Sequence, residues 1–374
     1  MTASARAVFR ELARSGAATR PQLGDILRLS RPTMSAAIAE LNGLGFVRVH
    51  GEVQGALGRK AQEYSLGPGA GHVIAVDAGS TKIQLRVSTL DRHLLSNREY
   101  SLPSSHLVLN EAISDAVAQE VDAARRAWTP AWGPLRAIGI AIPARVADER
   151  GDGSLTGENV IFSRFQPPDD ISIILENNVN CAAVAEQLYG AAQGHETFAY
   201  VQIGLKIGMG LMLNGTLLRG RNGAAGEIGH LAFPWAPGIP PEPGAAERHV
   251  GSEALMERVR AAWPAADARM PADTDELLVR AGEGHAVALE QLERHARDVG
   301  VVVASIVSVV DPGLVVLGGG LGASNLLTGT VSQVANHLSY SVDVCNTMLG
   351  RDATVLGIEK RTIDAAILAI VGLS

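Results

Sequence analysis

The chain has 374 residues and a hydrophobic content of 47%, which excludes a disordered protein and predicts more than one packed core. Its apolar runs, such as residues 301–310, are too short to span a bilayer, and its first twenty residues lack the apolar stretch of a secretion signal. Cys181 and Cys345 alone form no disulfide framework, so we expect a cytoplasmic protein.

The net charge of −7 is unevenly distributed along the chain. Residues 1–66 contain nine Lys and Arg against five Asp and Glu, a net charge of +4, which leaves −11 for the remainder. A basic head on an acidic body is typical of a modular DNA-binding protein whose body avoids phosphate.

Residues 1–68 predict a winged helix-turn-helix domain. A first helix ends near Gly16, and Thr19 with Gln22 three residues later predicts a capping box that begins a second helix. Ser30 begins a third helix, and glycines stop it. Two short strands, 46–50 and 62–66, then flank a glycine-rich arm.

We expect the third helix of this domain to enter the major groove of DNA and the basic arm to hold phosphate or enter a minor groove. The alternative is a three-helix packing domain with an ordinary solvated basic loop. The predicted DNA contacts are Arg31, Thr33, Ser35, Arg59 and Lys60.

From residue 72 the sequence changes to strands in which apolar residues recur at every second position. Apolar alternation before and after a glycine turn predicts a β-hairpin, whose tip holds Asp77, Gly79, Thr81 and Lys82. Backbone N–H groups and hydroxyls at such a tip can hold phosphate. An ordinary hairpin turn is an equally good interpretation of this motif alone.

Three further segments carry chemistry-bearing residues. A strand over 171–175 runs into Asn177, Asn178 and Asn180 and then an alanine-rich helix; simple cap chemistry is the alternative for these asparagines. Residues 201–220 contain Gly208 and Gly210, and residues 223–230 read GAAGEIGH. Later, a helix over about 288–310 leads into VVLGGGLG, which includes Gly318 and Gly319.

Together these segments resemble the ROK family of repressors and sugar kinases, in particular its transcriptional regulators, over essentially the whole chain. The resemblance implies an α/β fold: the winged helix-turn-helix followed by a two-lobed actin-like, hexokinase-like body of the ribonuclease H-like type. It implies domains at 1–68, at 72–177 completed by a C-terminal helix over 359–374, and at 178–358.

The resemblance also implies roles for individual residues. Asn177 and Asn178 match a sugar contact and the catalytic base, and Glu227 and His230 match contacts to sugar hydroxyls; Glu247 and Asn159 are further candidates for the sugar site. The nucleotide-loop residues are Asp77, Gly79, Thr81, Lys82, Gly208, Gly210, Gly318 and Gly319. For the last two glycines an ordinary strand–helix turn is the preferred interpretation.

The chain departs from the family's pattern at three places. Asn178 stands where the kinases carry an aspartate, and an amide cannot accept the proton of the attacking hydroxyl. Leu205 and Lys206 replace the Thr and Gly of the second phosphate segment. No cysteine lies between Cys181 and Cys345, so the family's zinc, held by His and three cysteines, has no thiolates here, and we predict no metal and no cofactor.

The leading hypothesis is a DNA-binding regulator, of repressor type, that senses a carbohydrate and has no enzymatic activity. We expect an operator DNA and a small-molecule carbohydrate as partners, no membrane, and a homodimer or dimer of dimers. Two alternatives remain open: an active sugar kinase fused to a DNA-binding domain, and a ligand-independent regulator controlled by a protein partner.

Overall fold

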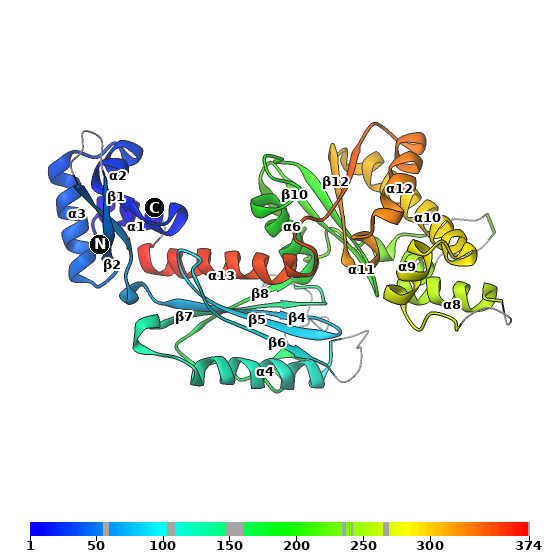
Figure 1. The fold of residues 1–374 in the computed structure, drawn as a ribbon, viewed down its shortest axis with the longest axis horizontal. Helices are drawn as coiled ribbons and strands as arrows, with labels where there is room; N and C mark the ends of the chain where they lie inside the picture. The colour runs from blue at the N-terminus through cyan, green and yellow to red at the C-terminus, as the bar shows by residue number, and fades with distance from the viewer. Residues whose placement is uncertain are drawn as a thin grey trace. The chain divides into compact units, whose positions relative to one another are not determined.

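A computed structural model describes residues 1–54, 60–102, 109–146, 160–233, 237–238, 240, 242–264 and 269–372. The chain divides into two compact units, and each is described by itself (Figure 1). Unit 1 comprises Met1–Ile142, Glu158–Glu176 and Ile358–Ser374, and unit 2 comprises Pro143–Gly157 and Asn177–Gly357. Residues 1–68 thus cluster with the first lobe, and their separate standing as a domain stays a prediction.

The predicted winged helix-turn-helix is confirmed at the N-terminus of unit 1. Three helices pack against a small antiparallel sheet of order β1-β3-β2. Thr19 and Gln22 form the expected capping box, and the Ser30 side chain caps the third helix. The elements are α1 (Ala3–Ser15), β1 (Ala18–Thr19), α2 (Arg20–Leu27), α3 (Arg31–Gly43), β2 (Val47–Gln54) and β3 (Lys60–Leu66).

The wing strands are longer than the sequence predicted. The sequence predicts that the arm begins at Gly51. In the structure, the pairing of β2 with β3 continues past this residue through a register shift between Val49 and Gly51. A bulge of this kind lets a strand continue with a stronger twist. Arg59, one of the predicted DNA contacts, lies outside the described residues.

Each unit contains one five-stranded sheet, and the two sheets share one topology. The orders are β6-β5-β4-β7-β8 and β11-β10-β9-β12-β13, so in both cases a meander of three strands is followed by two strands added beside the first. Within each sheet the first three strands pair antiparallel, and the fourth pairs parallel to the first. This repeat confirms the predicted two-lobed, ribonuclease H-like body.

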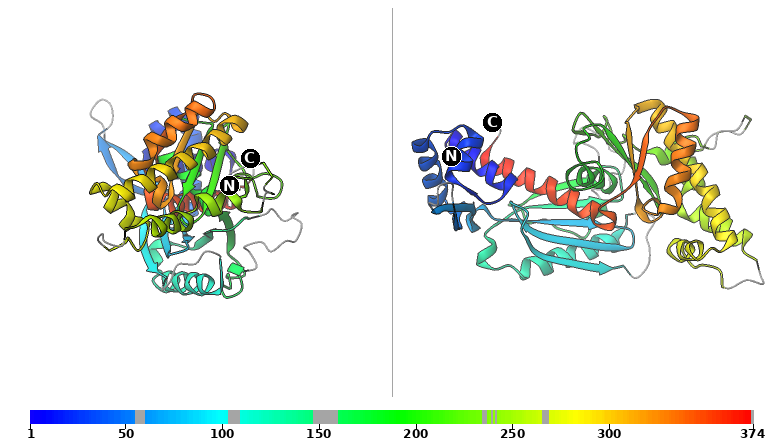
Figure 2. Two further views of the ribbon diagram at one scale, coloured as in Figure 1. Left: turned by 90° about the vertical axis from the view of Figure 1, so that its right-hand side faces the viewer. Right: turned by 45° about the horizontal axis from the view of Figure 1, so that its top comes forward.

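The sheet of unit 1 is covered on both faces by helices. In Figures 1 and 2, α4 lies along one face and α13 along the other. The buried residues of β4 and β7 are apolar apart from His72, as expected for a sheet between two helix layers. The elements are β4 (His72–Ala78), β5 (Lys82–Thr89), β6 (Leu94–Ser101), α4 (Glu111–Arg126), β7 (Leu135–Ile142), β8 (Ser172–Asn177) and α13 (Ala353–Val371).

The winged helix-turn-helix shares a hydrophobic core with the body of unit 1. One cluster joins Phe9 and Leu12 of α1 to Val73 of β4 and to Ile363 and Ala366 of α13. The Arg10 guanidinium donates to the Gly372 carbonyl at 3.0 Å, just beyond the end of α13. The C-terminal helix begins at Ala353 rather than at the expected residue 359, and its later residues pack in the same core as α1.

The sheet of unit 2 has two separate cores, one on each face. Along β9, Phe198 and Tyr200 face a cluster with α6, whereas Val201 and Ile203 face a larger cluster with the long helix α10 and its neighbours, because strand side chains alternate between faces. The elements are α6 (Asn178–Tyr189), β9 (Phe198–Ile203), β10 (Ile207–Leu213), β11 (Thr216–Leu218), η4 (Ile228–His230), α7 (Ala245–Val250), α8 (Ser252–Ala262), α9 (Thr274–Gly282), α10 (Ala286–Val310), β12 (Leu314–Gly318), α11 (Gly319–Gly322), α12 (Asn325–Leu338) and β13 (Asp343–Asn346).

Candidate functional site

The predicted hairpin of unit 1 is confirmed as β4 and β5, with residues 79–81 at its tip. Asp77 lies near the end of β4, between the buried Val76 and Ala78, and burial raises the pKa of its carboxyl to about 7 against the opposing charge of Lys82. The Lys82 ammonium lies 2.9 Å from Glu99 on the neighbouring strand β6. Thus a carboxylate of the same sheet pairs with the Lys82 cation at this tip.

The asparagines follow β8 as expected, and the first of them caps α6. The Asn177 side-chain oxygen accepts from the backbone N–H groups of Val179 and Asn180 at 2.8 and 3.2 Å, and its amide donates to the Ala144 carbonyl at 3.1 Å. The amide of Asn177 is therefore used in the cap chemistry that the sequence left as an alternative. Its sugar contact stays a prediction.

Asn178 begins α6 and is half-buried. Its Oδ1 accepts from the Val179 N–H at 2.9 Å, and its backbone carbonyl accepts from the Thr354 hydroxyl of α13 at 3.4 Å. Both ends of this residue are thus fixed within unit 2. A carboxamide held in this way can still donate and accept hydrogen bonds, although it is no proton acceptor at neutral pH.

Strand β10 contacts both α6 and the GAAGEIGH segment. A Cβ atom at Gly210 would lie 2.8 Å from the Val179 carbonyl oxygen of α6, so the glycine is needed for helix packing. The adjacent Met209 N–H donates to the Gly226 carbonyl at 2.9 Å. Gly208 also faces Val179. Neither glycine requires a nucleotide to explain it.

Glu227, His230 and Glu247 come from two short elements that pack on each other. Glu227 immediately precedes η4, and His230 ends it. Glu247 lies on α7, with its Oε2 only 3.3 Å from where a Cβ at Gly229 would lie, and the Ala246 N–H donates to the Leu231 carbonyl at 3.2 Å. The side chain of Glu247 is thus placed against the GAAGEIGH segment, as its assignment requires.

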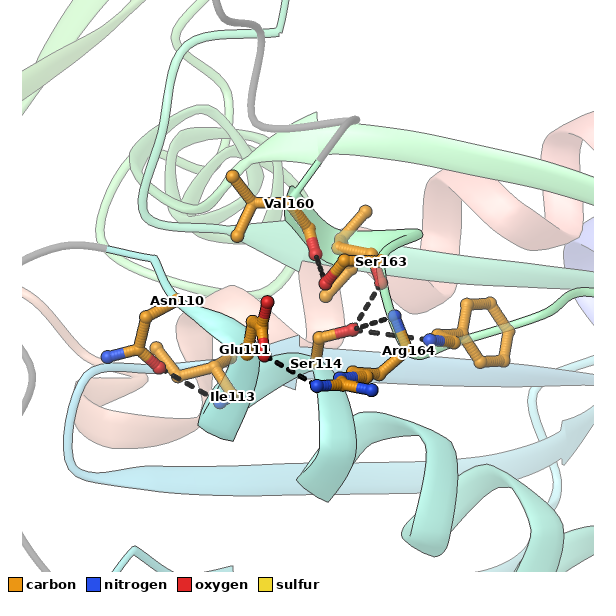
Figure 3. A network of polar contacts seen from close by, with 9 residues as sticks. Asn110, Glu111, Ile113, Ser114, Val160, Ser163 and Arg164 are labelled. Carbon is orange, nitrogen blue, oxygen red and sulfur yellow. Dashed lines mark hydrogen bonds and ion pairs between the residues drawn. The ribbon is translucent and has the colours of Figure 1, made fainter.

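Asn159 lies outside the described residues, but the chain directly after it is firmly held in unit 1. The Ser114 hydroxyl, fully buried on α4, donates to the Ile161 carbonyl at 2.6 Å and accepts from the N–H groups of Arg164 and Phe165 at 3.1 and 3.2 Å. The Arg164 side chain donates to Glu111 at 2.7 Å (Figure 3). These bonds fix the segment from residue 160 to α4.

The glycines at the end of β12 have a packing explanation. A Cβ at Gly318 would lie 1.9 Å from the Tyr200 hydroxyl oxygen, and one at Gly319 would lie 2.5 Å from the Ile203 carbonyl oxygen. Both positions therefore require glycine for close packing against β9. This geometry favours the strand–helix turn over a nucleotide contact for these two residues.

The DNA-facing candidates lie on α3 and the wing. Arg31 and Ser35 are exposed on α3, whereas the Thr33 hydroxyl is 2.7 Å from the Ser30 hydroxyl and takes part in the helix cap. The Lys60 ammonium lies 3.2 Å from Glu52 across the wing, and both side chains are largely exposed. Such an exposed ion pair contributes little to stability, so Lys60 can leave Glu52 and bind a phosphate instead.

The residues fit no structural zinc. The family's cysteine positions hold Pro, Gly and Ala in residues 237–247. Across the described ranges, no group of three or more His, Cys, Asp and Glu side chains is arranged to hold a metal ion. Likewise, the described helices include none long and apolar enough to cross a membrane.

Sequence reasoning missed a cluster of partly buried polar side chains that joins α7, α8 and α10. His249 of α7 lies 3.2 Å from Asp298 of α10. Arg258 of α8 donates to the His249 carbonyl at 3.0 Å and lies 3.3 Å from His295 Nδ1. The available signal was the spacing of Gln291, His295 and Asp298, which puts three polar residues in one row along α10.

His295 makes the stability of the protein depend on pH. Burial, with the charges of Arg258 and His249, lowers its pKa to about 3. Below about pH 6.5 the His295 side chain is protonated in the unfolded chain but stays neutral in the folded chain. The contribution of His295 to the free energy of unfolding is therefore fully present above about pH 6.5 and is lost progressively as the pH falls toward 3. At pH 5 the loss from this residue is about 2 kcal/mol.

We therefore expect a His295→Gln variant to lose less stability than the wild type between pH 7 and pH 5. Urea denaturation of both proteins at the two pH values measures the difference, and His72, whose pKa burial also lowers, is common to both. Equal losses in the two proteins would show that His295 does not carry this pH dependence.

The fold and site together define a class of protein. A winged helix-turn-helix precedes a duplicated ribonuclease H-like body of the actin and hexokinase type, and the second unit presents carboxylates and an imidazole on η4 and α7. The chain belongs to the ROK family, whose family model matches residues 73–360. The N-terminal module lies outside that match.

Known relatives include regulators and kinases. The chain is 22% identical to a xylose repressor of Bacillus subtilis over 370 residues, covering 96% of this chain and 94% of the repressor. It is 26% identical to a glucokinase of Streptomyces coelicolor, covering 77% of this chain and 96% of the kinase. A crystal structure of a ROK family transcriptional regulator, a homolog of the E. coli MLC protein, matches with a TM-score of 0.73 at 18% identity, covering 98% and 97% of the two chains.

Proposed function

We propose that this protein is a DNA-binding transcriptional regulator, of repressor type, whose ROK body senses a sugar and catalyses no reaction. One observation carries the proposal: a winged helix-turn-helix is joined to a body in which α6 begins with Asn178, the residue that the family resemblance matches to the kinase base. The similarity to the xylose repressor supports the proposal, because it covers 96% of this chain. The similarity to the glucokinase covers only 77% of the chain.

The sugar site of this proposal is built from Glu227, His230 and Glu247, with Asn178 at the start of α6 in the same unit. Carboxylates accept hydrogen bonds from vicinal hydroxyls, and imidazole both donates and accepts. Two carboxylates, an imidazole and a carboxamide can together donate to and accept from the hydroxyls of a neutral polyol. We expect recognition to need no metal and no cofactor, because the family's cysteine positions hold no thiolate in this chain.

Several residues argue against phosphoryl transfer. Asn178 cannot take the proton of the attacking hydroxyl, and a missing base costs typically 10²- to 10⁴-fold in rate. Leu205 supplies no hydroxyl to a phosphate, and the Lys82 ammonium is paired with Glu99. We therefore assign the body to binding alone.

Helix α13 offers a route from the sugar site to DNA. At its start, the Thr354 hydroxyl donates to the Asn178 carbonyl within unit 2. The boundary between the units falls inside this helix, after Gly357. Its later residues, including Ile363 and Ala366, belong to the core of the DNA-binding module. A shift of α6 upon sugar binding would be transmitted along one continuous helix, and in a homodimer it would change the spacing of paired recognition helices.

The test of this function is an ADP-release assay with ATP, Mg²⁺ and D-xylose, D-glucose or N-acetyl-D-glucosamine. We expect no turnover above background for the wild type. Asn178→Asp is the comparison, since it restores the missing carboxylate at nearly constant shape. Robust turnover by the wild type would support a kinase with a fused DNA-binding domain instead, the function that the glucokinase similarity favours.

A further inference from the structure

Three helices of unit 2, α7, α8 and α10, meet at a cluster of polar side chains, two of which are buried. Gln291 and His295 of α10 are buried, and within the described part of the chain Gln291 Oε1 and His295 Nε2 have no hydrogen-bond partner. Buried polar groups left incompletely paired destabilise a fold relative to apolar packing. Such a cluster therefore calls for a role other than stability.

The contacts of the cluster converge on one residue of α7. The His249 ring lies 3.2 Å from the Asp298 carboxylate of α10, and its centroid lies 5.4 Å from that of Phe233 in an edge-on contact. The Arg258 guanidinium of α8 donates to the His249 carbonyl at 3.0 Å and reaches His295 Nδ1 at 3.3 Å. His249 is thus held through its ring and through its backbone.

Helix α7, which these contacts hold, carries Glu247, one of the residues that we propose to bind the sugar. Glu247 lies two residues before His249 on α7, which has only six residues and is too short to hold its own conformation. In most of the family a zinc ion orders this region, and the residues here do not fit one. Some other device must hold α7 against η4.

We propose that His249, Arg258 and Asp298 form a clasp that fixes α7, and with it the carboxylate of Glu247, in the sugar-binding position without a metal ion. The three are positioning residues, since none is placed to touch the sugar. The clasp rests on the proposed sugar-sensing function and extends it by naming what replaces the zinc in this chain.

The first test compares two aspartate-to-asparagine variants by calorimetric titration with D-xylose, D-glucose and N-acetyl-D-glucosamine. Asp298→Asn removes the charge facing His249, and we expect the Kd of the tightest-binding sugar to rise about tenfold, as for loss of groups that orient a ligating residue. Asp275→Asn, which removes an exposed ion pair with Arg351 elsewhere in unit 2, should leave the Kd unchanged. EDTA should not change the affinity of the wild type.

A double-mutant cycle separates the clasp from a general loss of packing. His249→Gln and the Asp298→Asn, His249→Gln double variant should bind no more weakly than Asp298→Asn alone, because all three lack the same contact. His249→Gln also carries the test if Asp298→Asn does not fold. Unchanged affinity in the single variants, additive losses in the double variant, or weaker binding with EDTA would overturn the clasp. A wild type that binds none of the three sugars would overturn the proposed function itself.

Discussion

Replacing Glu227 by glutamine should weaken sugar binding about 10- to 100-fold, because a hydrogen bond to a charged group is worth about 1.5–3 kcal/mol. Glu227 borders η4, and glutamine keeps its shape while removing the charge that accepts from two hydroxyls. Calorimetric titration with the tightest-binding sugar measures the loss. DNA affinity without sugar should not change, since the winged helix-turn-helix belongs to unit 1.

The matched control for this prediction is Glu283→Gln, at an exposed position that follows α9 in the same unit. Its sugar affinity should equal that of the wild type. Equal affinities for Glu227→Gln and the control would place the sugar elsewhere and contradict the assignment of GAAGEIGH to recognition.

A second large effect is expected at Gly357 of α13. A Cβ there would lie 1.8 Å from the Cys181 carbonyl oxygen of α6, a backbone atom that cannot move aside cheaply. Gly357→Ala should therefore destabilise the protein by about 1–3 kcal/mol, or separate α13 from the helix that carries Asn178. In either case, we expect a weaker effect of sugar on DNA binding.

Gly329→Ala is the matched control for Gly357→Ala. Gly329 also lies within a helix, α12, but nothing lies within 4 Å of the position that its Cβ would take. Alanine there should stabilise the protein by about 0.5–1 kcal/mol, because glycine is a poor helix former. Thermal melts of the two variants should move in opposite directions. If both variants were destabilised by equal amounts, close packing of Gly357 against Cys181 would not explain the effect of Gly357→Ala.

The local chemistry of single elements could be predicted from the sequence. The capping box of Thr19 and Gln22, the hairpin around Asp77 and the helix after Asn177 all depend on residues near one another in the chain. Short-range patterns of this kind are set by backbone geometry and by alternation. The two-lobed body was predicted because the family resemblance implied its fold, and not from local patterns.

What could not be predicted depends on contacts between distant residues. Nothing local indicated that Ile363 packs with Phe9 in one core, or that His249 faces Asp298. The extension of the wing past Gly51 depends on pairing with β3, which overrides a local turn signal. The hydrogen bond from the Asn177 amide to the Ala144 carbonyl likewise joins residues that are distant in the chain.

The most direct test of the central claim measures DNA affinity and ADP release in one sample. The DNA is a duplex enriched from a random-sequence pool by binding to the wild type, and the sample contains ATP, Mg²⁺ and one sugar. We predict that a sugar shifts the Kd for this duplex, measured by fluorescence anisotropy, while no ADP forms. Sugar-dependent ADP release with an unchanged Kd for the duplex would contradict the account.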